Sequence, residues 1–236
     1  MTDESGPEAF VAGRLRANAA RTRRLVGRPE VITRLDGADF LSLTALLFAW
    51  TGAVLLVSGE PNWGVIVVLV GFLFDKLDGY YARRRGLTTE FGRQLDAFVD
   101  VFAYLLSGAL LFHVTMSPTP TVSVLVGFAL VGFGGLRLIR FTSEGFRSED
   151  GTSYYRGLTV VHANIVVLAN YLLYSFLGVW NGWVAAAAIA FACPLMISEY
   201  KSYKTVRSQA VAGLAGLVVA GLCLFLEFGP EVSVLG

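Results

Sequence analysis

The segment from Phe74 to Asp100 places four aspartates and four arginines between two strongly apolar stretches. It reads FDKLDGYYARRRGLTTEFGRQLDAFVD. Asp75 and Asp78 are three positions apart, and Asp96 and Asp100 are four apart, so each pair shares one face of a helix. Carboxylates spaced in this way can bind divalent cations or transfer protons. The segment is therefore a candidate for a metal or catalytic site.

Mutual repulsion among these carboxylates requires a cation. If two antiparallel helices bring the aspartates into one pocket, each pair about 5 Å apart repels by about 3 kcal/mol at an effective dielectric near 20. The neighbouring arginines offset part of this repulsion, and two divalent ions would neutralise all four aspartates. Hard oxygen ligands favour Mg²⁺ or Mn²⁺ over zinc, which prefers thiolate or imidazole. We therefore predict a two-metal site that acts on a phosphate group.

Three small residues share the helix faces of the aspartates, namely Gly79, Ala82 and Gly92. Such positions let a ligand approach the backbone. They also permit close packing of helices, as small residues do in membranes. The sequence leaves both interpretations open.

The composition is that of a membrane protein. Of 236 residues, 55% are hydrophobic, and the mean hydropathy is +0.61. The formal net charge of +1 gives no reason to expect a nucleic acid partner. A search for apolar stretches of about 20 residues predicts an all-α, polytopic membrane helix bundle. Its seven candidate transmembrane helices are residues 39–58, 62–82, 92–114, 120–141, 157–178, 182–199 and 208–227, of which the last is the least secure.

The distribution of basic residues predicts the orientation. All 19 Lys and Arg residues fall on the same side of the predicted helices. The positive-inside rule therefore places the N-terminus and the aspartates on the cytoplasmic side of the cell membrane. Residues 1–37 interleave arginines with apolar residues and predict a basic amphipathic helix on the membrane surface, with a partly disordered tail as the alternative.

The spacing pattern D-x2-D-G-x2-A-R-x8-G-x3-D-x3-D resembles the signature of the CDP-alcohol phosphotransferases. The matching positions are Asp75, Asp78, Gly79, Ala82, Arg83, Gly92, Asp96 and Asp100. The resemblance implies an integral membrane enzyme with a six-helix core over 38–204, followed here by an extra helix and tail over 205–236. Such an enzyme joins a CDP-activated lipid to an acceptor hydroxyl and releases CMP. The family commonly forms homodimers.

The resemblance also implies roles for individual residues. Asp75, Asp78 and Asp96 look like metal ligands, and Asp100 looks like both a shared ligand and the general base. The residues that would contact the CDP-lipid are Asp78, Gly79, Ala82, Arg83, Thr89 and Gly92. For Thr89, a helix N-cap is the alternative.

Three stretches resemble the phosphatidylserine and archaetidylserine synthase branch, which uses L-serine as acceptor. They are FDKLDGYYARRRG, GLRLIRF at 135–141 and LMISEYKSYK at 195–204. The chain departs from that branch in VFAYLLSGA after Asp100 and in GLTVVH from Gly157. Glycerol 3-phosphate and an inositol phosphate therefore remain alternative acceptors.

Arg137 and Arg140 would bind the serine carboxylate or the lipid phosphate, with anchoring at the membrane surface as the alternative. The resemblance implies CDP-diacylglycerol or CDP-archaeol as the lipid donor. The alternative from a different class is a divalent-cation transporter that uses intramembrane aspartates.

Overall fold

The computed structural model describes residues 35–86, 89–145, 147–149, 152–203 and 206–229. Residues Gly37–Gly236 form one compact unit, and every element below belongs to it. The amphipathic helix predicted over residues 1–37 lies outside the described residues, except for residues 35–37.

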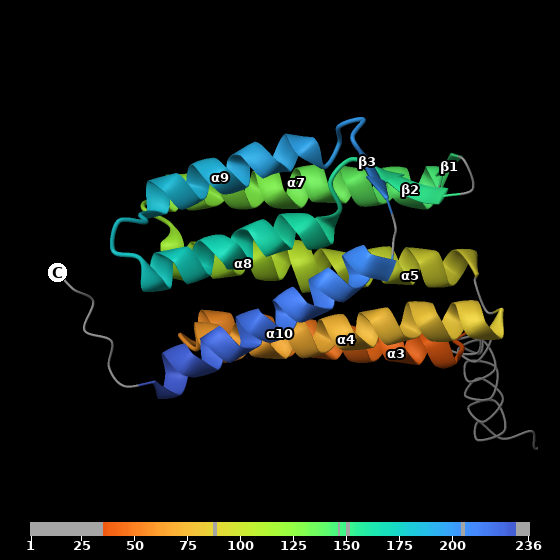
Figure 1. Ribbon diagram of the computed structural model, residues 1–236, viewed down its shortest axis with the longest axis horizontal. Helices are drawn as coiled ribbons and strands as arrows, with labels where there is room; N and C mark the ends of the chain where they lie inside the picture. Colours follow the sequence, from red (N-terminus) through yellow and green to blue (C-terminus); the bar gives the residue numbers. More distant parts are fainter. Residues whose placement is uncertain (1–34, 87–88, 146, 150–151, 204–205, 230–236) are drawn as a thin grey trace, which may run out of the picture. The chain divides into compact units, whose positions relative to one another are not determined.

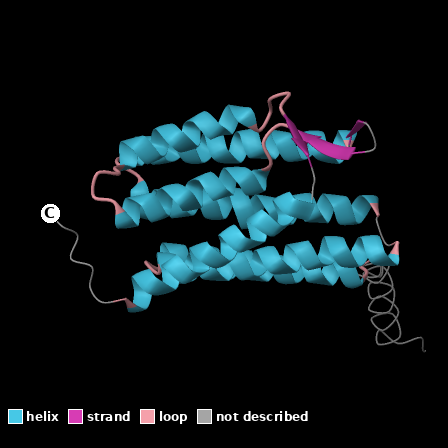
Figure 2. Ribbon diagram, viewed as in Figure 1, coloured by secondary structure: helices cyan, strands magenta, loops and turns pink. Residues whose placement is uncertain are grey.

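Helices make up most of this unit (Figures 1 and 2). The α-helices are α3 (Gly37–Val57), α4 (Pro61–Arg85), α5 (Glu90–Asp100), α6 (Ser107–Leu111), α7 (Pro120–Glu144), α8 (Val160–Phe176), α9 (Gly182–Leu195) and α10 (Val206–Phe228). The π-helical segment η1 (Val101–Leu106) joins α5 to α6, and a second one, η2 (Phe112–Met116), follows α6, so that Glu90–Met116 is one continuous helical segment. The predicted all-α class is thus confirmed for the membrane part of the chain.

A small antiparallel sheet is the one addition to the helices in the described part of the chain. Its strands are β1 (Arg147–Glu149), β2 (Thr152–Arg156) and β3 (Lys201–Tyr203), in the order β1-β2-β3. The sequence predicted only charged, turn-forming breaks at these places. The sheet joins the loop after α7 to the segment after α9.

Four helical segments are long and apolar enough to cross a membrane. They are Gly37–Val57, Glu90–Met116, Pro120–Glu144 and Ala210–Phe228. The last of these is the predicted helix that the sequence supported least. The other three predicted spans are also helical, but α4 carries charged residues and α8 and α9 have only 17 and 14 residues.

Small side chains allow α3 and α4 to pack closely. Half of the buried residues of α3 are alanines, and Gly52 lies among them. A Cβ added at Gly52 would lie 2.9 Å from the carbonyl oxygen of Gly64 in α4, so a larger residue has no room there. Ser42 lies on the same face of α3, and its hydroxyl donates a hydrogen bond to the buried Asp78 of α4.

At the turn between α4 and α5, the end of α4 and the start of α5 are both capped. Gly86 follows α4 with φ 67°, and its N–H donates to the carbonyl oxygen of Ala82. Thr89 precedes α5, and its hydroxyl oxygen accepts a hydrogen bond from the N–H of Gly92 at 2.9 Å. These caps fix where the two helices end and begin, and so fix which faces carry the aspartates.

Arg140 ties α7 to the end of α9. Its Nη1 donates to the carbonyl oxygen of Ile197 at 2.9 Å, and its Nη2 donates to those of Arg156 at 2.8 Å and Met196 at 3.2 Å. Carbonyl groups at the end of a helix lack partners within the helix, and Arg140 supplies donors for them. The arginine therefore holds the loop after α9 against α7.

Candidate metal and active site

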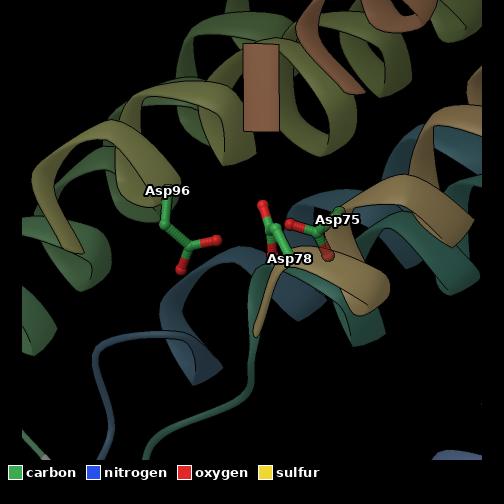
Figure 3. A group of neighbouring side chains, drawn as sticks. All are labelled: Asp75, Asp78 and Asp96. Carbon is green, nitrogen blue, oxygen red and sulfur yellow. The ribbon is translucent and has the colours of Figure 1, made fainter. Parts of the chain in front are cut away.

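Three of the four predicted aspartates converge from two helices. Asp75 and Asp78 lie in the C-terminal half of α4, and Asp96 lies in α5. One carboxylate oxygen from each lies within 4.8 Å of the others, and Asp75 and Asp78 are buried. Figure 3 shows the three side chains pointing toward one another. The helical spacing in the sequence correctly predicted that these groups would face each other.

Asp100 stands apart from this cluster. It is the last residue of α5, one turn after Asp96, and it does not belong to the group of carboxylates that meet within 4.8 Å among the described residues. Its carboxylate is still within electrostatic range of Asp75, Asp96 and the guanidinium of Arg137. A carboxylate beside a cation site is well placed to accept a proton.

Three donors that the sequence did not predict hold the cluster. The Tyr104 hydroxyl and the Lys76 ammonium both donate to Oδ2 of Asp75, each at 2.8 Å. The Ser42 hydroxyl donates to Oδ2 of Asp78. Lys76 lies within the signature, and Tyr104 follows Asp96 and Asp100 at the same four-residue spacing, whereas Ser42 reaches the site only through the fold.

The donor set of the cluster fits Mg²⁺ or Mn²⁺. All three groups are carboxylates, which offer the hard oxygen ligands that these ions prefer. The cluster has no thiolate or imidazole that would favour zinc. Its charge and burial also favour a bound cation, because Lys76 is the one basic residue that pairs with these three aspartates in the described part of the chain.

The small residues near the cluster pack against side chains of this chain. A Cβ added at Gly79 would lie 3.1 Å from Nη1 of Arg83, so that guanidinium lies close to the Gly79 backbone. A Cβ added at Gly92 would lie 3.1 Å from Oγ1 of Thr89 and 3.4 Å from Oδ1 of Asp39. The structure therefore shows packing at Gly92, and it shows the N-cap alternative for Thr89.

The two arginines of α7 occupy different surroundings. Arg137 is buried, with its guanidinium 5.3 Å from the ring centroid of Phe141 and within range of Asp100. Arg140 instead donates to the backbone carbonyls beyond α9. Of the two, Arg137 is the one whose charge acts on a predicted site residue.

A small pocket lies beside these arginines. It is lined by Arg137, Arg140, Phe141, Glu144, Gly145, Tyr154 and Arg156. Arg156 donates to Glu199 and, at 3.1 Å, to Glu144, and these hydrogen bonds raise the pKa of Arg156. The pocket thus contains side chains of both charges.

These features define a membrane helix bundle with a buried carboxylate cluster suited to a divalent cation. Residues 35–198 match the family model of the CDP-alcohol phosphatidyltransferases. The chain belongs to this family of CDP-alcohol phosphotransferases, membrane transferases of phospholipid synthesis. The predicted resemblance is confirmed.

Three curated relatives are similar to parts of this chain. Archaetidylserine synthase of Methanothermobacter thermautotrophicus is 29% identical over 163 residues, which cover 68% of this chain and 66% of that protein. CDP-diacylglycerol–serine O-phosphatidyltransferase of Methanocaldococcus jannaschii is 27% identical over 163 residues, which cover 69% and 75%. CDP-diacylglycerol–glycerol-3-phosphate 3-phosphatidyltransferase of Bacillus subtilis is 38% identical over 80 residues, which cover 32% and 39%.

Proposed function

We propose that this protein transfers the phosphatidyl-type group, diacyl or archaetidyl, from a CDP-activated lipid to the hydroxyl of L-serine and releases CMP. The observation that carries the proposal is the buried cluster of Asp75, Asp78 and Asp96 in a chain of this family. The names of two relatives, an archaetidylserine synthase and a serine O-phosphatidyltransferase, support serine as the acceptor.

Asp100 is the proposed base. It accepts the proton of the serine hydroxyl while the serine oxygen forms its bond to the phosphorus on the lipid side of the diphosphate. The bond between that phosphorus and the bridging oxygen breaks, and its electron pair leaves with CMP. Asp75, Asp78 and Asp96 would hold Mg²⁺ or Mn²⁺, as two ions with Asp100 as shared ligand, and bound metal supplies positive charge next to the diphosphate. No covalent intermediate with the enzyme is needed.

Arg83 and Gly79 are the proposed contacts of the CDP-lipid. Arg83 is exposed at the end of α4, and its guanidinium lies close to the Gly79 backbone. An arginine in this position can pair with phosphate oxygens. The aspartates of α4 lie on the same helix face, so a diphosphate held there would be next to the cluster.

Arg137 is the proposed partner of the serine carboxylate. It is buried, it lies within range of Asp100, and it lines the small pocket in which Glu144 already pairs with Arg156. Glycerol 3-phosphate remains the alternative acceptor because a Bacillus subtilis relative is named for it.

Membrane orientation and assembly belong to the same proposal. We place the N-terminus and the active site on the cytoplasmic side because the basic residues gather there by the positive-inside rule. We also propose a homodimer. Labelling of an Arg84→Cys variant in sealed vesicles tests the orientation, and light scattering in detergent tests the dimer.

An acceptor screen tests the reaction. Purified protein is mixed with CDP-diacylglycerol or CDP-archaeol, Mg²⁺ or Mn²⁺, and one acceptor, and CMP release is measured. We expect release with serine, loss of release in Asp96→Asn and little change in Glu90→Gln, which removes an exposed carboxylate from the same helix.

Two results would contradict the proposal at different levels. Turnover with glycerol 3-phosphate or an inositol phosphate, but not with serine, would refute the acceptor and keep the reaction class. Divalent-ion flux in liposomes that depends on Asp96, without CMP release from any acceptor, would instead establish the transporter alternative.

A further inference from the structure

Tyr104 links the carboxylate cluster to a part of the fold outside the sequence signature. It lies in η1, one turn after Asp100, and only 3% of its surface is exposed. Its hydroxyl donates to Oδ2 of Asp75 at 2.8 Å, across the space between η1 and α4. None of the roles proposed above uses this residue.

Both the side chain and the backbone of Tyr104 are held in place. Its ring packs edge-on against Phe72 of α4, with ring centroids 6.2 Å apart and an interplanar angle of 79°. Nδ2 of Asn164 in α8 donates to the Tyr104 carbonyl oxygen at 2.7 Å. Gly108 leaves room for this amide, because a Cβ there would lie 3.1 Å from Nδ2.

The π-helical segment sets the direction of the Tyr104 side chain. With hydrogen bonds from residue i to i+5, residues of η1 are turned about the helix axis relative to a continuous α-helix. Such segments occur frequently at functional sites. Here the segment follows Asp100 directly and places a phenol beside Asp75, which lies 29 positions earlier in the chain.

The hydrogen bonds to Asp75 determine how its carboxylate is presented. Tyr104 and Lys76 both donate to Oδ2, and these two hydrogen bonds restrict rotation of the Asp75 carboxylate about its Cβ–Cγ bond. The Lys76 side chain is 49% exposed and has a long flexible stem, whereas the tyrosine is buried and has few rotatable bonds. Tyr104 is therefore the more rigid of the two supports.

We propose that Tyr104 is a positioning residue that orients Asp75 for Mg²⁺ or Mn²⁺ and thereby sets the metal affinity of the site. The inference rests on the proposed function, because it assumes that the cluster binds a metal ion. Groups that hydrogen-bond to metal-ligating side chains typically change metal affinity about 10- to 100-fold when they are removed. Tyr104 would act through Asp75, without contacting the substrate.

Direct Mn²⁺ binding to the full chain in detergent, followed by electron paramagnetic resonance of free Mn²⁺, tests this proposal. Tyr104→Phe keeps the ring and its contact with Phe72 but removes the hydroxyl. We expect its Kd for Mn²⁺ to rise about 10- to 100-fold. At saturating Mn²⁺ its kcat for CMP release should return close to the wild-type value.

Tyr171→Phe is the matched control. Tyr171 is also buried, and its hydroxyl donates to Oδ1 of Asn62 at 2.7 Å. Asn62 lies 13 positions before Asp75 in α4, which is about 20 Å along the helix. This variant should therefore lose a comparable hydrogen bond while its Kd for Mn²⁺ stays unchanged.

Further variants separate failure of this inference from failure of the proposed function. Asp96→Asn should abolish Mn²⁺ binding, and wild-type binding in that variant would overturn the metal site itself. If Asp96→Asn loses Mn²⁺ while Tyr104→Phe binds as wild type, the positioning role is refuted and the function stands. Asn164→Ala, which releases the Tyr104 backbone, should weaken Mn²⁺ binding in the same direction, so it gives the answer even if Tyr104→Phe does not fold.

Discussion

The carboxylate cluster should destabilise the protein when no cation is bound. Oxygens of Asp75, Asp78 and Asp96 meet within 4.8 Å. Two unit charges at about this distance repel by about 3.5 kcal/mol at an effective dielectric near 20. Asp96→Asn removes two such repulsions and keeps the side-chain shape, but it also loses the attraction between Asp96 and Lys76. We expect a net gain of about 1–3 kcal/mol in the free energy of unfolding.

Thermal unfolding in detergent at pH 8 measures this gain. One kcal/mol shifts Tm by about 2–4 °C in a chain of this size, so Asp96→Asn should unfold about 5 °C above wild type in EDTA. Added Mn²⁺ should raise the Tm of wild type and leave that of the variant unchanged. Glu90→Gln, an exposed change in the same helix, should behave as wild type in both conditions.

Two outcomes would refute this reasoning. A lower Tm of Asp96→Asn in EDTA would mean that its carboxylate stabilises the metal-free fold. A full rise in Tm with Mn²⁺ in the variant would mean that the ion binds elsewhere. In either case, repulsion among the three aspartates would no longer be a reason for the fold to bind a cation at this cluster.

Three other changes separate the roles of individual residues. Asp100→Asn should lower CMP release at least about 100-fold while Mn²⁺ binding persists. Asp75→Asn should lose both CMP release and Mn²⁺ binding. Equal loss of Mn²⁺ binding in the two variants would contradict the division between base and ligand. Arg140→Ala should lower the free energy of unfolding by about 2–4 kcal/mol, because these carbonyl oxygens lose their donor. Thermal melts measure this loss, and an unchanged Tm would contradict the structural role of Arg140. Thr89→Ala should cost about 1 kcal/mol of stability with an unchanged KM for the CDP-lipid, and a raised KM would assign Thr89 to nucleotide binding.

Local periodicity explains why much of the site could be predicted. The spacing of Asp75, Asp78 and Asp96 fixes which helix face each occupies, and a short turn between α4 and α5 makes those faces meet. Apolar stretches of sufficient length likewise predicted the helices, because a segment in a membrane must satisfy its backbone hydrogen bonds internally, and a helix does so. Spacing within two neighbouring helices therefore predicted where three of the aspartates meet, whereas Asp100, one turn further along α5, lies outside that cluster among the described residues.

Contacts that depend on distant segments could not be predicted in this way. Ser42 precedes Asp78 by 36 positions, and its role depends on the close packing of α3 and α4. Tyr104 shares the four-residue spacing of Asp96 and Asp100, but its hydrogen bond to Asp75 depends on a π-helical segment, which that periodicity does not reveal. The pairing of β3 with β2 likewise joins segments that lie on either side of α8 and α9, which gives no local signal.

The short lengths of α8 and α9 have a consequence for the surrounding bilayer. At 17 and 14 residues they extend about 26 and 21 Å, less than the hydrocarbon thickness of about 30 Å. Thinning of the bilayer next to short helices is one way in which a membrane adapts to such hydrophobic mismatch. Because Asn164 of α8 donates to Tyr104, thinning next to α8 would lie beside the site. The headgroup region would then lie closer to the carboxylates, so a water-soluble acceptor and a lipid substrate would meet nearer to the water interface.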